Sequence, residues 1–191
     1  MSQEIEIEFK HLLTYDQFKH IKESLPFPQT PIVQKNHYFE TIDHTLIHQS
    51  CALRIRVKND SYVATLKEPC VEGILETHDI LSEAEMKAWI NDYPTPTENI
   101  HKRLVERGIS LKDIQYIGFL TTKRYSYSSE DLVYVLDESI YGNQVDYELE
   151  IESQSYSEGE QAYHHLKNKF QLEDKKPITK IERFLQSIHP K

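Results

Sequence analysis

Three segments of this sequence alternate strictly between charged and large apolar residues. Residues 4–10 read Glu-Ile-Glu-Ile-Glu-Phe-Lys, residues 53–58 read Leu-Arg-Ile-Arg-Val-Lys, and residues 147–152 read Tyr-Glu-Leu-Glu-Ile-Glu. A period of two is typical of β-strands, because successive side chains point to opposite faces of the sheet. Each segment is therefore predicted to be a strand with one ionic face and one apolar face.

Two architectures accommodate such strands, and the alternation alone leaves both open. In an ordinary amphipathic sheet, the ionic face meets solvent and the apolar face packs on helices. In a closed barrel, the ionic faces turn inward and helices cover the apolar outside. The charges are segregated by sign between strands, whereas solvent-facing sheets usually mix signs across neighbours. Rows of like charge repel each other, so the segregation favours a bound anion near the basic row and a bound cation near the acidic rows.

Capping signals divide the rest of the chain. Thr14 with Gln17, and Ser82 with Glu85, have the spacing of a capping box, which marks the start of a helix. Helices are predicted at about 15–25, 83–92, 98–108 (capped by Thr97), 157–172 and 179–189 (capped by Thr179 with Glu182). Further strands are predicted at about 32–40, 44–49, 51–58, 61–68 and 73–80 and within 113–152. We predict one α+β domain over residues 1–191 with about eight mainly antiparallel strands.

The composition narrows the class of protein. A net charge of −9 argues against a general nucleic-acid binder, although a local basic group can still bind a small anion. No run approaches the roughly 20 apolar residues that cross a membrane, so no membrane association is expected. The chain starts with a charged segment instead of an apolar signal region, which predicts a cytoplasmic protein. Cys51 and Cys70 lack the spacing of a zinc site, and no phosphate-binding glycine loop is present.

Several short motifs, in order, resemble those of the CYTH proteins, also called triphosphate tunnel metalloenzymes, and most closely their small stand-alone bacterial members. The first is Glu-x-Glu-x-Lys, matched by Glu6, Glu8 and Lys10. The others are Tyr38-Phe39-Glu40-Thr41, Ala52-Leu53-Arg54-Ile55-Arg56, Thr65-Leu66-Lys67, Leu136-Asp137 and Glu148-Leu149-Glu150. A single such motif is weak evidence, but the ordered set over residues 4–152 is specific.

The resemblance implies a fold and a set of site residues. The fold would be an eight-stranded antiparallel β-barrel that forms an open tunnel, with helices packed on its outside. The cofactor would be Mg²⁺ or Mn²⁺, which prefer oxygen ligands. The implied catalytic residues are Glu6, Glu8, Lys10 and Glu150; the substrate-binding residues are Lys10, Arg54, Arg56, Lys67 and Arg124; and the metal ligands are Glu6, Glu8, Glu76, Asp137, Glu148 and Glu150.

This sequence departs from the family pattern at a few positions. Thr122 stands where the family often has a lysine two residues before Arg124, and strand parity predicts that Lys123 points to the opposite face. Glu40 stands where aspartate is commoner. The register of the late acidic pair is open among residues 148, 150 and 152, and we favour the first two. Lys180 and Arg183 on the last helix could reach the tunnel mouth, but we favour a surface role for both.

The leading hypothesis is a metal-dependent triphosphatase that hydrolyses inorganic triphosphate or a small organic triphosphate, such as thiamine or nucleoside triphosphate. Three alternatives stay open: a class IV-type adenylate cyclase, a noncatalytic polyphosphate- or nucleotide-binding module, and a scaffold with a solvated charged sheet. The expected partner is a small triphosphate-bearing substrate, and the pattern does not distinguish a monomer from a homodimer.

Overall fold

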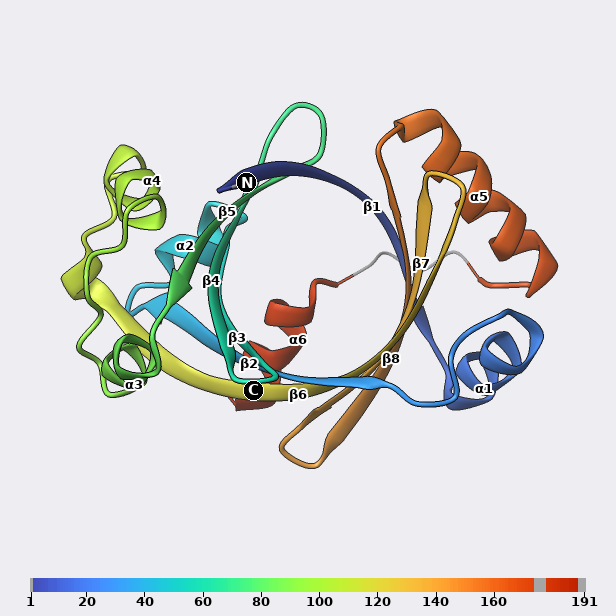
Figure 1. Cartoon of the computed structure of the whole chain (residues 1–191), viewed down its shortest axis with the longest axis horizontal. Coiled ribbons are helices and arrows are strands. Elements are labelled where there is room, and N and C mark those ends of the chain that lie inside the picture. Colours follow the sequence, from blue (N-terminus) through green and yellow to red (C-terminus); the bar gives the residue numbers. More distant parts are fainter. Residues whose placement is uncertain (1, 174–177, 189–191) are drawn as a thin grey trace. The chain divides into compact units, whose positions relative to one another are not determined.

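The computed structural model describes residues 2–173 and 178–188. Within these residues, eight strands close into a barrel in the order β1-β5-β4-β3-β2-β6-β7-β8 (Figure 1). Strand pairing is antiparallel in β1–β8, β2–β3, β3–β4, β4–β5, β6–β7 and β7–β8. The predicted eight-stranded antiparallel barrel is therefore confirmed.

The strands are β1 (Gln3–Leu13), β2 (Ile32–Thr41), β3 (Ala52–Lys58), β4 (Ser61–Pro69), β5 (Ile74–Leu81), β6 (Ile114–Ser129), β7 (Leu132–Tyr141) and β8 (Gln144–Ser153). The helices are α1 (Tyr15–Ser24), α2 (Thr45–His48), α3 (Glu83–Ile90), α4 (Ile100–Glu106), α5 (Tyr156–Lys169) and α6 (Lys180–Ile188), with a 3₁₀ turn at Leu111–Asp113. The capping boxes predicted before α1 and α3 are both formed, and so are the reciprocal bonds between Thr179 and Glu182. Residue 189 of the last predicted helix lies outside the described residues. Among the described residues, no helix combines the length and the apolar character needed to cross a membrane.

The chain forms two compact units, and each has its own hydrophobic core. The first unit comprises residues 1–5 and 34–120, and the second comprises residues 6–33 and 121–191. In the first unit, α2, α3 and α4 cover one face of the sheet (Figure 1). The large side chains fully buried in this core include Phe39, Leu46, Leu53, Ile55, Leu66, Trp89, Ile100 and Leu104. The apolar face of β3 therefore packs on helices, as the alternation predicts.

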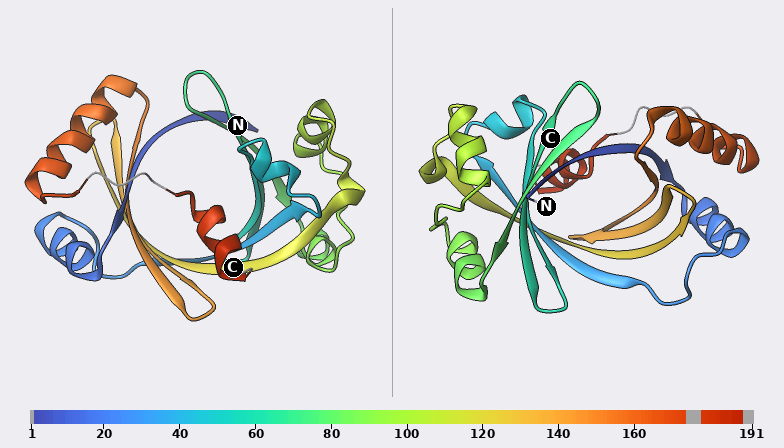
Figure 2. Two further views of the ribbon diagram at one scale, coloured as in Figure 1. Left: turned by 180° about the vertical axis from the view of Figure 1, so that it is seen from behind. Right: turned by 45° about the horizontal axis from the view of Figure 1, so that its top comes forward.

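In the second unit, α1 and α5 cover the apolar face of β7 and β8 (Figure 2). The buried side chains there include Phe18, Ile21, Leu136, Leu149, Ile151 and Leu166. Gly159 allows α5 to approach β1 closely, because a Cβ at this position would lie 2.6 Å from Cε2 of Phe9. The charged faces of the strands are the ones that these helices leave uncovered.

One predicted strand is wrong: residues 44–49 contain helix α2 instead. The buried carboxylate of Glu40 accepts hydrogen bonds from the backbone N–H groups of Leu46, at 2.9 Å, and Ile47, at 3.0 Å. His44 adopts a left-handed backbone, with φ of 59°, which turns the chain just before the helix. Since helix starts need acceptors for their free N–H groups, an acidic side chain from the preceding strand makes this short helix possible. The glutamate in the Tyr38–Thr41 motif thus has a local structural role.

A buried glutamate on the helix-covered face also has a structural role. Glu68 of β4 accepts hydrogen bonds from Arg103 Nε at 2.9 Å and Nη2 at 3.0 Å, and it also contacts Arg107. Burial alone would raise the pKa of Glu68, but the bonds from the two α4 arginines outweigh burial and lower that pKa. The cluster attaches α4 to the sheet, so not every charged strand residue belongs to the ionic face.

The start of α4 is capped by a residue from another element. Thr97 is predicted as the cap, but the carboxylate of Asp79 on β5 accepts hydrogen bonds from the backbone N–H of Asn99 at 3.1 Å and of Ile100 at 2.7 Å. We expect Asp79→Ala to lower the free energy of unfolding by about 1–2 kcal/mol, because it leaves these donors without their acceptor. Urea denaturation would measure the change as a shift in midpoint at unchanged slope. Asp131→Ala, in an exposed turn, is the control, and an equal shift in both variants would contradict the capping role.

Candidate functional site

The first unit carries a basic row on its uncovered face. Arg54 and Arg56 of β3 alternate with Leu53 and Ile55, which are fully buried under the helices, so the two guanidinium groups lie on the opposite face. Asn36 of β2 accepts a hydrogen bond from Arg56 Nε at 3.0 Å. Guanidinium groups present planar donor pairs that match phosphate oxygens. This row is suited to binding an anion.

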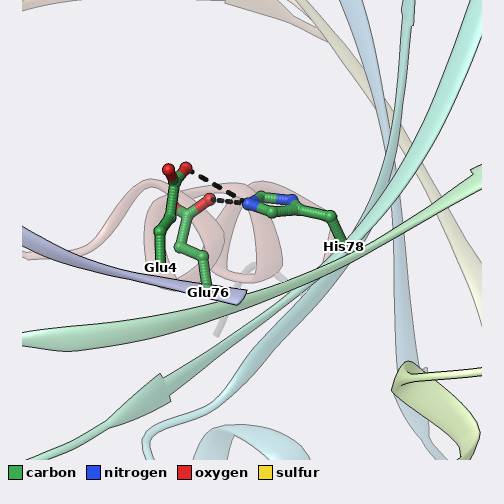
Figure 3. Close-up of side chains that lie close together, drawn as sticks. All are labelled: Glu4, Glu76 and His78. Carbon is green, nitrogen blue, oxygen red and sulfur yellow. Dashed lines mark hydrogen bonds and ion pairs between the residues drawn. The ribbon is translucent and has the colours of Figure 1, made fainter. Parts of the chain in front are cut away.

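The same face continues across β4 and β5 with groups of both signs. Lys67 lies opposite Glu76 in the β4–β5 register, and the two side chains form an ion pair. Thr65 lies opposite His78, and its hydroxyl is 3.0 Å from His78 Nδ1. The imidazole also meets Glu76 and Glu4 (Figure 3). The structure thus brings the predicted Lys67 and Glu76 together and adds His78, which the sequence reasoning did not select.

The second unit carries a dense network centred on Arg124 of β6. The Arg124 guanidinium donates to Asp137 of β7 through Nε at 2.8 Å and Nη2 at 2.7 Å. Nη2 also donates to Glu150 of β8 at 2.7 Å, and Nη1 lies 3.5 Å from Glu152. Asp137 faces Glu148 across the β7–β8 pair. The predicted Arg124, Asp137, Glu148 and Glu150 therefore lie together.

Helix α6 adds two cations that the sequence reasoning interpreted as surface residues. Lys180 Nζ lies 2.7 Å from Asp137 Oδ2 and 3.0 Å from Glu148 Oε2. Arg183 Nη2 lies 2.8 Å from the same Glu148 oxygen, and its Nε donates to Asp146 at 2.6 Å. The surface interpretation is wrong, because both side chains are largely buried against β7 and β8. The sequence does contain one indication of this placement. Lys180 and Arg183 are three residues apart, so they lie on the same side of an amphipathic helix.

The network keeps its groups charged. Burial by itself would raise the pKa of Asp137, but Lys180 and Arg124 outweigh burial and lower that pKa. Burial would lower the pKa of Lys180, whereas its carboxylate neighbours Asp137 and Glu148 raise it above the ordinary value. The same balance raises the pKa of Arg124 well above its ordinary value. These side chains therefore form charge-assisted bonds at neutral pH.

Strand β1 places the Glu-x-Glu-x-Lys residues beside this network. Lys10 lies opposite Glu150 in the β1–β8 register, and Glu8 lies opposite Glu152. Lys10 and Glu8 form an ion pair with each other. Glu6 lies on the same face, two positions before Glu8. The described part of the second unit thus holds Glu6, Glu8, Lys10, Arg124, Asp137, Glu148 and Glu150 on β1 and β6–β8.

Thr122 and Lys123, where this sequence departs from the family pattern, lie on opposite faces of β6. Thr122 is buried, and its hydroxyl lies 3.3 Å from that of Ser139. Lys123 forms an ion pair with Glu138 at 3.0 Å on the opposite face from Arg124, as strand parity predicts. An ammonium group is still present on the face of Thr122, because Lys180 contacts Asp137 there.

The late acidic row becomes less buried along β8. The Glu148 side chain is 2% exposed and that of Glu150 is 8% exposed, whereas that of Glu152 is 30% exposed. The first two also contact Lys180, at 3.0 Å and 3.6 Å. Glu152 therefore lies at the exposed end of the acidic row, whereas Glu148 and Glu150 lie at its buried end.

The donor set of the second unit fits a hard divalent cation. The ion pairs of this network join five carboxylates to the side chains of Arg124, Lys180 and Arg183. Carboxylate oxygens are the ligands that Mg²⁺ and Mn²⁺ prefer. The contacts of Asp137, Glu148 and Glu150 with Lys180 show that these oxygens can share one cationic centre. A basic row in one unit and a carboxylate cluster in the other are the groups that metal-assisted phosphoryl chemistry uses.

Known proteins share both the sequence pattern and the fold. The chain matches the family described as "CYTH domain" over residues 4–185. A Bacillus subtilis protein named "Putative triphosphatase YjbK" is 42% identical over 187 residues, which cover 97% of each chain.

Two solved structures place this likeness in three dimensions. A Bacillus halodurans structure described as "a putative adenylate cyclase" has a TM-score of 0.92 at 35% identity and covers 96% of this chain and 99% of its own. A Hippeastrum protein described as a "putative adenylyl cyclase" with a dominant triphosphatase activity has a TM-score of 0.75 at 23% identity, covers 96% of each chain and supports the fold. The chain therefore belongs to the CYTH domain family.

Proposed function

We propose that this protein is a divalent-metal-dependent triphosphatase, with residues 1–191 acting as a single CYTH-like domain. Its substrate would be inorganic triphosphate or a small organic triphosphate. The single observation that carries the proposal is the convergence of three buried carboxylates, those of Asp137, Glu148 and Glu150, on the ammonium group of Lys180. Carboxylate oxygens gathered around one cationic centre are the ligand type that Mg²⁺ and Mn²⁺ prefer. The relative named as a triphosphatase supports the same assignment.

Each unit would contribute different chemistry. In the first unit, Arg54, Arg56 and Lys67 would bind phosphate oxygens, and Asn36 orients Arg56 through the bond to Nε. In the second unit, Arg124 would stabilise negative charge that develops on a departing phosphate. Lys10 would assist in the same way, and it lies opposite Glu150 in the strand register.

The carboxylates of the second unit have two proposed roles. Glu6, Glu8, Asp137, Glu148 and Glu150 would hold the cation of the second unit, and Glu76 is proposed as a cation ligand within the first unit. A bound Mg²⁺ or Mn²⁺ would supply charge neutralisation and a more acidic water. Glu150, held by Arg124 and Lys180, would orient that water by accepting its hydrogen bond.

A substrate panel tests the proposal directly. Phosphate release is measured with inorganic triphosphate, thiamine triphosphate and ATP, each with Mg²⁺, Mn²⁺ or EDTA. We expect turnover with at least one triphosphate, stimulation by a divalent ion and loss of turnover with EDTA. Tight binding of triphosphates without metal-stimulated turnover would replace the proposal with a noncatalytic binding module. The same ATP reactions are assayed for cyclic AMP, because a structural relative is described as a cyclase; cyclisation faster than phosphate release would overturn the triphosphatase assignment.

A further inference from the structure

Two carboxylates and an imidazole converge on the ionic face of the first unit. Figure 3 shows Glu4 of β1 with Glu76 and His78 of β5, their polar ends directed at one another. His78 Nε2 lies 3.3 Å from Glu4 Oε1 and 3.4 Å from Glu76 Oε2. One donor atom from each of the three residues lies within 4.8 Å of the others. Three ligand atoms at this spacing can share a single cation.

The imidazole is oriented by its other nitrogen. His78 Nδ1 lies 3.0 Å from the hydroxyl of Thr65, which is buried directly across the β4–β5 pair. Histidines that bind metals usually have their second nitrogen held by such a partner, which fixes the ring and directs the first nitrogen to the ion. Thr65 thus holds the ring with Nε2 directed at the two carboxylates. The contact with Thr65 therefore pre-organises the imidazole as a metal ligand.

Backbone and side-chain contacts fix the two strands that carry the ligands. The backbone N–H of His78 donates to the carbonyl of Ser2 at 2.7 Å, and Gln3 Nε2 donates to the Thr77 hydroxyl at 3.1 Å. These contacts attach the start of β1 to β5, so Glu4 is placed next to Glu76 by the fold.

Glu76 meets two different groups through its two oxygens. Lys67 forms its ion pair with Oε1 of Glu76, whereas Oε2 faces His78. Oε1 of Glu76 therefore pairs with the lysine of the basic row, and Oε2 points to the imidazole of the cluster. The Oε2 side of Glu76 is therefore the side that the cluster uses, with Glu4 and His78 as its neighbours there.

The mixture of nitrogen and oxygen donors determines which ion fits. Mg²⁺ keeps oxygen ligands and several waters, whereas imidazole nitrogen suits first-row transition ions. We propose that Glu4, Glu76 and His78 form a site for a divalent transition metal ion, with His78 as the ligand that favours such an ion over Mg²⁺. The proposal does not depend on the triphosphatase activity. It predicts two different cation sites in one chain. The site in the second unit has only oxygen ligands, and the site in the first unit has both oxygen and nitrogen ligands.

Cobalt(II) is the probe for this site, because its visible absorption reports a nitrogen ligand. The full-length protein is titrated with CoCl₂ in a phosphate-free buffer, and binding is followed by visible absorption and calorimetry. We expect His78→Asn to weaken Co²⁺ binding by at least about tenfold and to change the spectrum, since the altered group is a direct ligand. Glu4→Gln, at an exposed position, should weaken binding and keep the nitrogen signature. Mg²⁺ affinity should be unchanged in His78→Asn.

The controls separate this site from the carboxylate cluster of the second unit. His164→Asn, on the exposed side of α5, should bind Co²⁺ like the unaltered protein. The titrations are repeated in a Glu150→Gln background, in which the proposed catalytic cluster is weakened, so that failure of one assignment does not imply failure of the other. Circular dichroism and urea midpoints confirm folding of each variant. Equal Co²⁺ affinity and an identical spectrum in His78→Asn and the unaltered protein would overturn the proposal, as would undiminished affinity in Glu4→Gln.

Discussion

Replacing Glu150 with Gln is expected to lower triphosphate turnover by at least about 10²-fold, with the fold intact. Gln keeps the size of the side chain but removes the negative charge, so the cation and the attacking water lose a ligand of the proposed site. Arg124 and Lys180 keep Asp137 as a partner, at 2.7 Å from each, so neither cation is left unpaired. The loss should therefore appear in kcat more than in the free energy of unfolding.

Steady-state phosphate release at saturating Mg²⁺ or Mn²⁺ measures the effect. The matched control is Glu138→Gln, because Glu138 lies on the neighbouring strand but pairs with Lys123 on the opposite face. The control should retain turnover. If Glu150→Gln were as active as Glu138→Gln, the second-unit cluster would have no part in catalysis and the proposed mechanism would fail.

The second large effect is expected at the basic row. We predict that Arg56→Ala reduces kcat/KM by roughly 10²–10³-fold, since it removes a charged donor pair directed at phosphate. Arg56→Lys should recover only part of the loss, because an ammonium group keeps the charge without the planar geometry. The bond from Arg56 Nε to Asn36 Oδ1 orients the plane of the guanidinium group.

Kinetics with inorganic triphosphate at several concentrations separate the change in KM from the change in kcat. Lys87→Ala removes a cation from the same unit on the exposed side of α3, where its partner is Glu83, and should leave both constants unaltered. A loss of similar size in Lys87→Ala would indicate a nonspecific charge effect. An unchanged kcat/KM in Arg56→Ala would exclude the basic row as the phosphate-binding group.

Most of the sheet could be predicted because its evidence is local and repeated. The strict alternation around Leu53–Lys58 and Tyr147–Glu152 assigns each side chain to a face, and register between neighbours follows once one face is buried. The turn at Asn59 and Asp60 agrees with this, since both residues have positive φ, of 48° and 58°, as a tight hairpin requires. The ionic and apolar faces lie where the alternation places them.

The features that sequence reasoning missed depend on contacts between distant residues. Helix α2 starts where it does because Glu40 accepts its N–H bonds, and α4 is capped from β5 by Asp79. Neither acceptor is adjacent in sequence to the helix that it caps. Lys180 and Arg183 look like ordinary surface cations until α6 is placed on β7 and β8. His78 becomes a candidate ligand only when the start of β1 lies beside β5.

The pairing of β1 with β8 has a consequence for how the protein forms during synthesis. Ile7 of β1 pairs with Ser153 of β8, so this edge of β1 finds its partner only after 146 further residues have been made. At about 5–20 residues per second, that interval is roughly 7–30 s, during which an alternating charged strand has an unpaired edge. The glutamates of β1 in one nascent chain repel those in another, and this repulsion disfavours strand pairing between chains on neighbouring ribosomes. The same carboxylates that are proposed to hold a cation in the finished protein would thus limit aggregation of the unfinished one.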